Sequence, residues 1–543
     1  MAFTTRRSSI GPSGGTARRA AILLLLEFAL TTLASACAMG GSEPPPIPPT
    51  MRRRADAGLG DAPPPSDAVA PPADDASSPA ADTATPAVDA GTPPADPARF
   101  APVVAALEQS LRTSHTPGAA VAIMIGGRVV FTAARGVRSA GGTDAVTPDT
   151  LFRVGSLAKP MTSAMVQTLV DDGMLDLRAP IRRYVPYFGV RAPGNPDTVT
   201  MHAVLSHTAG YPNGFPMGLS STCVPYGAAG LVASFRGLTD APLWYPPGAA
   251  WQYSNTGYAL AGLVAQEAGR QPYVDLMRTR VFERAEMSGA TFDGVRAAAA
   301  DHAVGHALDA SGAVTERFGP EQPDCAFAHP MSTTLFASAT DLARFGAWIA
   351  RGAGSPGGAA LARMSAPYAE TTESMGGYGY GWFIEPWDDT GAAITHGGSV
   401  AGFGAFLWLH PARQFGVAVV GNSDAFDPSE AAQAAIQSFL AAPTVRPASL
   451  DPRPMTEWSV YAGQYRDPVG DLGNVTVDVS GTTLMLTIAR TGERVELRPW
   501  GRDRFTFSAS ATEGHETTAL FFVDSSGRTT WLTTRWGAAS RVM

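Results

Sequence analysis

The chain has 543 residues, a formal net charge of −8, 45% hydrophobic residues and three cysteines. This length allows several domains with a large core, and the acidic balance argues against a nucleic-acid partner. Because Cys37, Cys223 and Cys325 show no CxxC spacing, a zinc ribbon and a thioredoxin-like redox motif are both excluded. Cys223 and Cys325 either form one disulfide outside the cytoplasm or remain two buried thiols.

The N-terminus has the features of an export signal. Arginines at positions 6, 7, 18 and 19 precede the apolar run 20–33, and small residues lead from there to Cys37. The run is shorter than a comfortable membrane span. We expect residues 1–37 to be an export signal, cleaved either in the ordinary way or as a bacterial lipoprotein signal with lipid on Cys37, and we favour the lipoprotein. The protein would then reside in the bacterial cell envelope, in the periplasm or as a lipoprotein anchored to the membrane.

Residues 38–97 differ in composition from the rest of the chain. They consist mainly of Pro, Ala, Asp and Ser. Such a segment cannot bury enough apolar surface to fold, and its prolines keep it extended. We predict a disordered linker that tethers the folded part of the chain to the membrane.

The first folded domain is predicted over residues 98–445. Apolar residues with helical spacing indicate a helix over 100–111. Two apolar runs, 118–125 and 129–134, flank a Gly-Gly turn and predict a β-hairpin.

A second predicted helix begins near Ser156 and continues to Gly173. Pro160 is compatible with this helix because proline is tolerated in a first turn. Ser156 should therefore lie at a helix N-terminus, where backbone N–H groups and a partial positive charge favour a developing oxyanion.

Lys159 is the only lysine among 40 basic residues, and it follows Ser156 by three positions. Arginine stays protonated in proteins, whereas a buried lysine amine can become neutral and accept a proton. A serine hydroxyl needs such a base to become a nucleophile. On a helix the two side chains would share one face, so the spacing predicts a serine nucleophile with a lysine base.

Two later segments add candidate residues. Tyr253-Ser-Asn255 lies in a turn before the helical run 259–268, and His396-Gly-Gly-Ser399 precedes strand-like runs at 404–410 and 416–421. A tyrosine beside an ammonium group can shuttle a proton, and glycines allow close approach to a strand. Taken alone, a tyrosine in an apolar turn is more often a packing residue.

Together these motifs resemble the serine β-lactamase and penicillin-binding-protein superfamily, in its class C-like branch. The branch includes class C β-lactamases, D-alanyl-D-alanine carboxypeptidases, D-aminopeptidases and family VIII esterases. The resemblance covers about residues 100–442 and extends to four flanking segments, at 204–210, 338–345, 378–382 and 397–403. It implies a mixed α/β (α+β) fold, with an antiparallel sheet flanked by helices and a helical subdomain.

The resemblance also implies a role for each motif residue. Ser156 is expected to be the acylated nucleophile, Lys159 its base partner and Tyr253 the proton shuttle. The backbone N–H groups of Ser156 and Ser399 would form the oxyanion hole. Substrate contacts would come from Asn255, His396, Gly397 and Gly398.

His396 departs from the class C pattern, which has lysine at this place. Histidine is mostly neutral at pH 7, so the fixed charge that helps to hold a β-lactam carboxylate is missing. The departure favours a carboxylesterase or D-amino-acid peptidase over an efficient β-lactamase. The expected substrates are small esters, amides or D-amino-acid peptides, with no metal and no organic cofactor.

Residues 455–543 are predicted to form a separate all-β domain. Short alternating runs separated by turns such as Ser480-Gly481 indicate a meander that closes into a barrel. The opening Ala462-Gly-Gln-Tyr465 resembles the lipocalin-like domains appended to some members of the superfamily. Covering the active-site cleft, binding a ligand and simple stabilisation all remain open as roles.

Two further interpretations compete with this one. His302 and His306 are four residues apart, but the stretch lacks the glutamate of a zinc hydrolase and contains a helix-weakening glycine. His202 and His207 are expected to be structural, with His207 bonding a turn beside the active site. The alternative to a hydrolase is a catalytically idle protein that binds peptidoglycan peptides or acts as a scaffold, for which a titratable Lys159 would have no use.

Overall fold

The computed structural model describes residues 97–542 apart from 191–194, 212–231, 233–242, 310, 321–334, 352–357, 373, 375, 446–450, 468–472, 510–515 and 535–536. The predicted export signal, the predicted linker up to residue 96, and Cys37, Cys223 and Cys325 lie outside the described residues. Within the described part of the chain, none of the helices combines the length and apolar character that crossing a bilayer requires.

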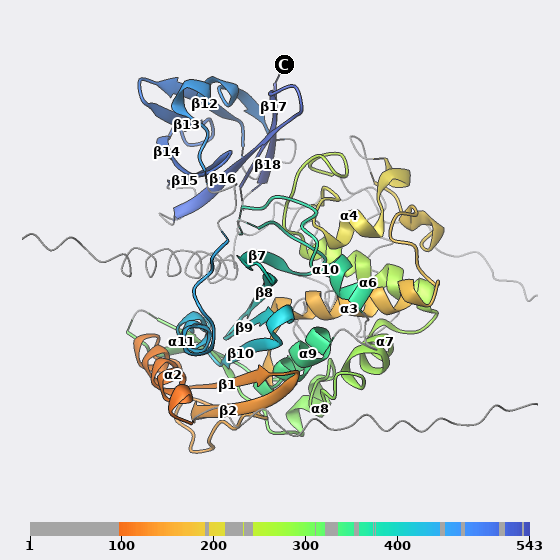
Figure 1. Ribbon diagram of the computed structural model, residues 1–543, viewed down its shortest axis with the longest axis vertical. Coiled ribbons are helices and arrows are strands. Elements are labelled where there is room, and N and C mark those ends of the chain that lie inside the picture. Colours follow the sequence, from red (N-terminus) through yellow and green to blue (C-terminus); the bar gives the residue numbers. More distant parts are fainter. Residues whose placement is uncertain are drawn as a thin grey trace, which may run out of the picture. The chain divides into compact units, whose positions relative to one another are not determined.

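A six-stranded antiparallel sheet forms the centre of the larger domain (Figure 1). Its strand order is β2-β1-β10-β9-β8-β7. The first strand therefore pairs with a late one, and Ala119 lies opposite Gly421. The strands are β1 (Gly118–Ile125), β2 (Arg128–Gly136), β7 (Phe383–Asp388), β8 (Gly391–Val400), β9 (Phe403–His410) and β10 (Phe415–Gly421).

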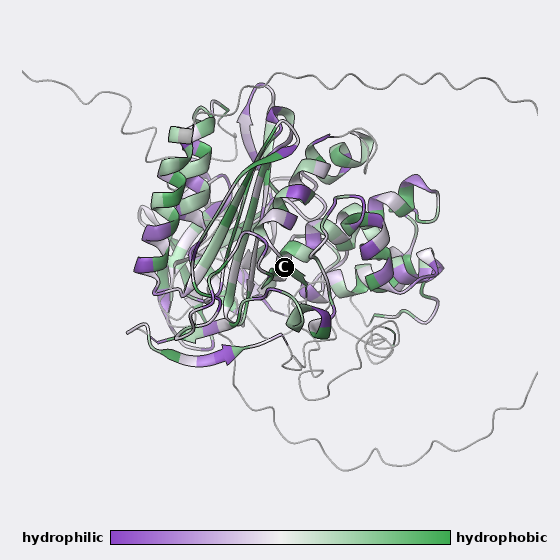
Figure 2. Ribbon diagram, turned by 90° about the horizontal axis from the view of Figure 1, so that it is seen from below, coloured by the Kyte–Doolittle hydropathy of each residue, from purple (hydrophilic) through white to green (hydrophobic). Residues whose placement is uncertain are grey.

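Helices cover both faces of this sheet. On one face lie α2 (Ala101–Thr113) and α11 (Ser429–Phe439), and on the other lies α9 (Ala339–Arg351) (Figure 2). Every residue of β9 and β10 is buried, which explains their continuous apolar runs. The edge strand β2 alternates between exposed and half-buried residues along most of its length.

A helical region lies beside the sheet. Its central helix, α3 (Ala158–Asp171), is buried from Ala158 through Leu169, because neighbouring helices pack around it. The other helices are α4 (Met201–Leu205), α6 (Asn255–Gly269), α7 (Tyr273–Met277), α8 (Gly294–Ala298) and α10 (Gly358–Met364). Two short antiparallel pairs complete the domain: β3 (Phe152–Arg153) with β6 (Phe336–Ala337), and β4 (Gly305–Leu308) with β5 (Val314–Phe318).

The C-terminal region is a closed eight-stranded barrel. The predicted mixed fold with a C-terminal barrel is therefore confirmed. Strands β11 and β18 close the ring through the pair Tyr465 and Arg541. Aromatic and aliphatic side chains such as Tyr461, Phe505 and Phe521 pack in its interior. The strands are β11 (Gly463–Arg466), β12 (Val475–Ser480), β13 (Thr483–Ile488), β14 (Arg494–Gly501), β15 (Arg504–Ser508), β16 (Glu516–Val523), β17 (Thr529–Thr534) and β18 (Gly537–Arg541).

The outer face of the last barrel strands is buried against the larger domain. Arg504 is fully buried, and its Nε donates a hydrogen bond to the carbonyl oxygen of Thr371 at 3.0 Å. The rings of Trp531 and Tyr245 lie 5.6 Å apart. Phe522 packs against the buried rings of Trp251, Tyr378 and Phe383, which also contact Tyr253.

Candidate active site

Ser156 lies in the short 3-10 turn Gly155–Leu157 that leads into α3. Gly155 has φ +52, a left-handed conformation that favours glycine. A Cβ at Gly155 would also lie only 3.0 Å from the amide nitrogen of Ser399, and one at Gly398 only 1.9 Å from the carbonyl oxygen of Val154. These two glycines allow β8 and the turn that carries Ser156 to lie in direct contact.

Lys159 follows one helical turn later, in the first turn of α3. Its Nζ lies 3.0 Å from Ser156 Oγ and donates a hydrogen bond to Asn255 Oδ1 at 2.7 Å. The side chain is 0% exposed, and this burial lowers the pKa of Lys159 well below its usual 10.5. The geometry gives Ser156 an amine that can exist in the neutral, proton-accepting form.

Tyr253 and Asn255 reach the same point from the start of α6. Ser254 is the N-cap of this helix, and its hydroxyl accepts a hydrogen bond from the Gly257 amide at 2.9 Å. The cap fixes the turn, so that the Tyr253 hydroxyl lies 2.8 Å from Ser156 Oγ. Lys159 Nζ also lies 4.8 Å from the centre of the Tyr253 ring. Lys159 and Tyr253 thus contact the Ser156 oxygen directly, and Asn255 joins the group through Lys159.

The strand β8 borders the serine turn. Its pairing with β7 extends only as far as Thr395, whereas its pairing with β9 continues to Val400. Residues 396–400 therefore lie beyond the end of β7, where Ser399 adjoins Gly155. This arrangement brings the two backbone segments expected to supply the oxyanion hole side by side.

His396 is placed differently from the substrate-contacting residue that the sequence suggested. Its side chain is 1% exposed, its Nδ1 donates to the carbonyl oxygen of Gly397 at 2.6 Å, and the Tyr378 hydroxyl lies 3.3 Å from its Nε2. Burial and the nearby Lys159 lower the pKa of His396 to about 3. The ring is therefore neutral at physiological pH and forms part of the packed wall behind Tyr253.

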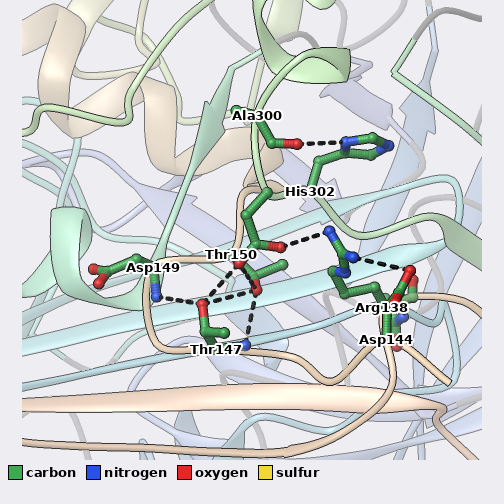
Figure 3. Close-up of polar contacts among 9 residues, drawn as sticks. Arg138, Asp144, Thr147, Asp149, Thr150, Ala300 and His302 are labelled. Carbon is green, nitrogen blue, oxygen red and sulfur yellow. Dashed lines mark hydrogen bonds and ion pairs between the residues drawn. The ribbon is translucent and has the colours of Figure 1, made fainter.

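The remaining histidines do not form a metal centre within the described residues. His306 uses both ring nitrogens, because Nδ1 donates to the Asn422 carbonyl at 2.8 Å and Nε2 accepts from the Ala140 amide at 3.0 Å. His302 instead bonds the carbonyl oxygen of Ala300 at 3.0 Å, near the ion pair of Arg138 and Asp144 (Figure 3).

The sequence model of the Beta-lactamase family matches residues 103–441 of this chain. Because this match spans more than half of the chain, the protein belongs to the β-lactamase family.

Among curated proteins, the chain is 24% identical over 320 residues to Protein flp of Staphylococcus aureus strain MW2, which covers 58% of this chain and 61% of that protein. It is 33% identical over 177 residues to Esterase EstB of Burkholderia gladioli, which covers 31% of this chain and 45% of the esterase. The chain therefore spans less than two thirds of the length of these relatives.

Solved structures share the fold. The crystal structure of SurE is similar with a TM-score of 0.64 and 25% identity, and the match covers 82% of this chain and 99% of SurE. The class C β-lactamase from Rhodobacter sphaeroides is similar with a TM-score of 0.51 and 21% identity, over 62% of this chain and 99% of that enzyme. This second likeness concerns the fold alone.

Proposed function

We propose that the protein is a serine hydrolase that cleaves an ester or amide through an acyl-enzyme on Ser156. The observation that carries the proposal is the position of Ser156 Oγ, 2.8 Å from the Tyr253 hydroxyl and 3.0 Å from Nζ of the buried Lys159. A neutral amine and a phenol within hydrogen-bond distance of one serine are the parts that general-base activation requires.

The reaction follows from these contacts. Lys159, acting with Tyr253, takes the hydroxyl proton of Ser156 while Oγ forms a bond to the substrate carbonyl carbon. The backbone N–H groups of Ser156 and Ser399 bind the oxyanion of the tetrahedral intermediate. When the intermediate collapses, the bond to the leaving group breaks and Tyr253 delivers the proton to the departing alcohol or amine. Water then attacks the acyl-ester and gives its proton to the same pair. The bond between the acyl carbon and Oγ breaks, the pair returns that proton to Oγ, and the acid leaves.

The substrate class proposed is a small ester or D-amino-acid peptide rather than a β-lactam. A neutral, buried His396 supplies no fixed positive charge for a β-lactam carboxylate, and the pKa of about 3 supports this point. The similarity to Esterase EstB also favours an ester substrate.

Labelling with a fluorophosphonate probe tests the nucleophile. We expect one modified residue, Ser156, and no modification of Ser156→Ala, whereas Ser311→Ala serves as a matched control with a remote exposed serine. Wild-type protein that stays unlabelled, or labelling that persists in Ser156→Ala, would favour the catalytically idle binder. A panel of aryl esters, D-Ala-D-Ala peptides and a chromogenic cephalosporin, compared by kcat/KM, then tests the substrate class. The highest value for the cephalosporin would contradict the ester or peptidase assignment.

A further inference from the structure

His207 lies behind the candidate active site in an uncommon backbone conformation. It follows α4 and has φ +60, a left-handed value that few residues other than glycine adopt. Its carbonyl oxygen accepts a hydrogen bond from the Gln252 amide at 3.0 Å. The backbone of His207 is therefore tied to the segment that leads to Tyr253.

The imidazole makes a second connection to this segment. Its Nδ1 accepts a hydrogen bond from the amide of Ser254 at 3.1 Å, and Ser254 is the residue between Tyr253 and Asn255. The ring also packs on Tyr253, with ring centres 4.5 Å apart. The rings of three further residues surround it, with centres 4.8–6.0 Å away: Tyr378, Tyr258 and Trp251.

These contacts fix the protonation state of His207. An amide N–H can only donate, so Nδ1 must keep its lone pair and the single ring proton lies on Nε2. Nε2 is buried and has no hydrogen-bond partner among the described residues. Burial, together with Lys159 and His396, holds the pKa of His207 well below its usual 6.5.

We propose that His207 is a positioning residue that holds Tyr253 against Ser156, acting as a neutral imidazole whose Nδ1 anchors the Ser254 amide. The inference rests on the proposed function and assigns a role to a residue that does not touch the substrate. Packing alone would be satisfied by any ring of similar size. A phenyl ring lacks the acceptor that Nδ1 offers to the Ser254 amide, and losing a buried hydrogen bond allows the turn that carries Tyr253 to move.

Two substitutions separate the acceptor from the ring. His207→Phe keeps a ring and removes the acceptor. His207→Asn keeps an acceptor close to the position of Nδ1 and suits the left-handed backbone, but it removes the ring. We expect His207→Phe to lower kcat and the fluorophosphonate acylation rate about 10- to 100-fold with KM little changed, since small misplacements of a reacting group have effects of this size. We expect His207→Asn to recover most of this loss.

A double-mutant cycle with Tyr253→Phe tests whether the effect passes through the tyrosine. If His207 acts by positioning the Tyr253 hydroxyl, His207→Phe should have almost no further effect on the acylation rate in the Tyr253→Phe background. An equal loss in both backgrounds, or a folded His207→Phe variant with the wild-type rate, would overturn the inference. Wild-type protein that fails to acylate Ser156 at all would instead overturn the proposed function.

An NMR experiment tests the tautomer of His207 independently of enzymatic activity. In ¹⁵N-histidine NMR spectra of wild-type protein, His207 should show an unprotonated Nδ1 and a protonated Nε2 throughout pH 5.5–8, a range chosen around the usual histidine pKa of about 6.5. A proton on Nδ1, or titration within that range, would contradict the hydrogen bond to Ser254 on which the role depends.

Discussion

The Tyr378 hydroxyl lies 3.3 Å from Nε2 of His396, and the opposite nitrogen of that ring donates to the carbonyl oxygen of Gly397. The two contacts fix one neutral tautomer, since the carbonyl can only accept and the hydroxyl can donate. The ring centres of His396 and Tyr253 are 6.2 Å apart. His396 is therefore an uncharged, buried ring beside Tyr253.

The buried state of His396 should make stability depend on pH. The folded protein keeps this ring neutral down to a pKa of about 3, whereas a histidine in the unfolded chain titrates near 6.5. Below pH 6.5 the unfolded chain therefore binds a proton that the folded protein does not. As the pH is lowered in this range, the free energy of unfolding decreases by about 1.4 kcal/mol per pH unit. Urea unfolding should show that, between pH 7 and pH 5, the free energy of unfolding decreases by about 2 kcal/mol less in His396→Asn than in wild type. Equal decreases in both proteins would contradict the neutral state of His396 in the folded protein. His115→Asn, at an exposed position, is the control.

Replacing Lys159 by methionine should separate activity from stability. The pKa of the buried amine is lowered by desolvation, so between the folded-state pKa and the usual lysine pKa the unfolded chain binds a proton that the folded state does not, and this costs stability. Lys159→Met should lose activity about 10²- to 10⁴-fold, the usual contribution of a general base. Its free energy of unfolding should exceed that of wild type by on the order of 1 kcal/mol, the usual gain from a single stabilising substitution.

The difference in free energy of unfolding between Lys159→Met and wild type should depend on pH, and this dependence tests the lowered pKa of Lys159. As pH rises from 7 toward 10, the unfolded chain loses its extra proton and wild type should approach the variant in stability. A difference that stays constant with pH, measured by chemical denaturation, would contradict the lowered pKa of Lys159.

Gly155→Ala should damage both the fold and the site. The substitution places a Cβ at φ +52, with 3.0 Å to the Ser399 amide nitrogen and 2.9 Å to its carbonyl oxygen. Strain of this kind costs about 1–3 kcal/mol, and relief requires the turn and β8 to move apart. We expect a lower melting temperature and loss of fluorophosphonate labelling. Gly173→Ala is the matched control, because that residue also has positive φ but no atoms within 4 Å of an added Cβ. The same effects in both variants would argue against the contact with Ser399.

Phe522→Ala should show that the barrel supports the active site. Phe522 packs against the buried rings of Trp251, Tyr378 and Phe383, which also contact Tyr253, so truncation leaves a gap beside the rings that support the tyrosine. We expect a loss of about 2–4 kcal/mol in the free energy of unfolding, reduced to the extent that Phe522 is only half-buried, together with a decrease in kcat. Val479→Ala, at an exposed barrel position, should leave both unchanged. Wild-type stability in Phe522→Ala would mean that the barrel contact contributes no support.

Much of the fold and the residues around Ser156 could be predicted from the sequence, because both depend on local patterns. The single lysine one helical turn after a serine and the Tyr-x-Asn at the start of a helix identify residues that the structure links through three contacts of 2.7–3.0 Å. The expectation that His207 is a structural residue bonding a turn beside the active site agrees with its hydrogen bond to Ser254. The partner itself, 47 positions away, could not be predicted, because neither this separation nor the left-handed backbone of His207 leaves a local pattern. The burial of His396 could not be predicted either, because it depends on Tyr378 and Phe383 packing from other segments. Strands β11 and β18 are short and contain glycine and arginine, so their pairing depends on closure of the barrel rather than on β propensity.

The buried outer face of the barrel bears on how this protein can be divided. A cut at residues 446–450 looks convenient from the sequence, but it would uncover Tyr245, Trp244 and Trp251 on one fragment and Ala538, Phe522 and Trp531 on the other. Both fragments would expose apolar patches and tend to self-associate. The two folded regions are therefore best expressed as a single piece, and the catalytic unit in practice extends to the last strand.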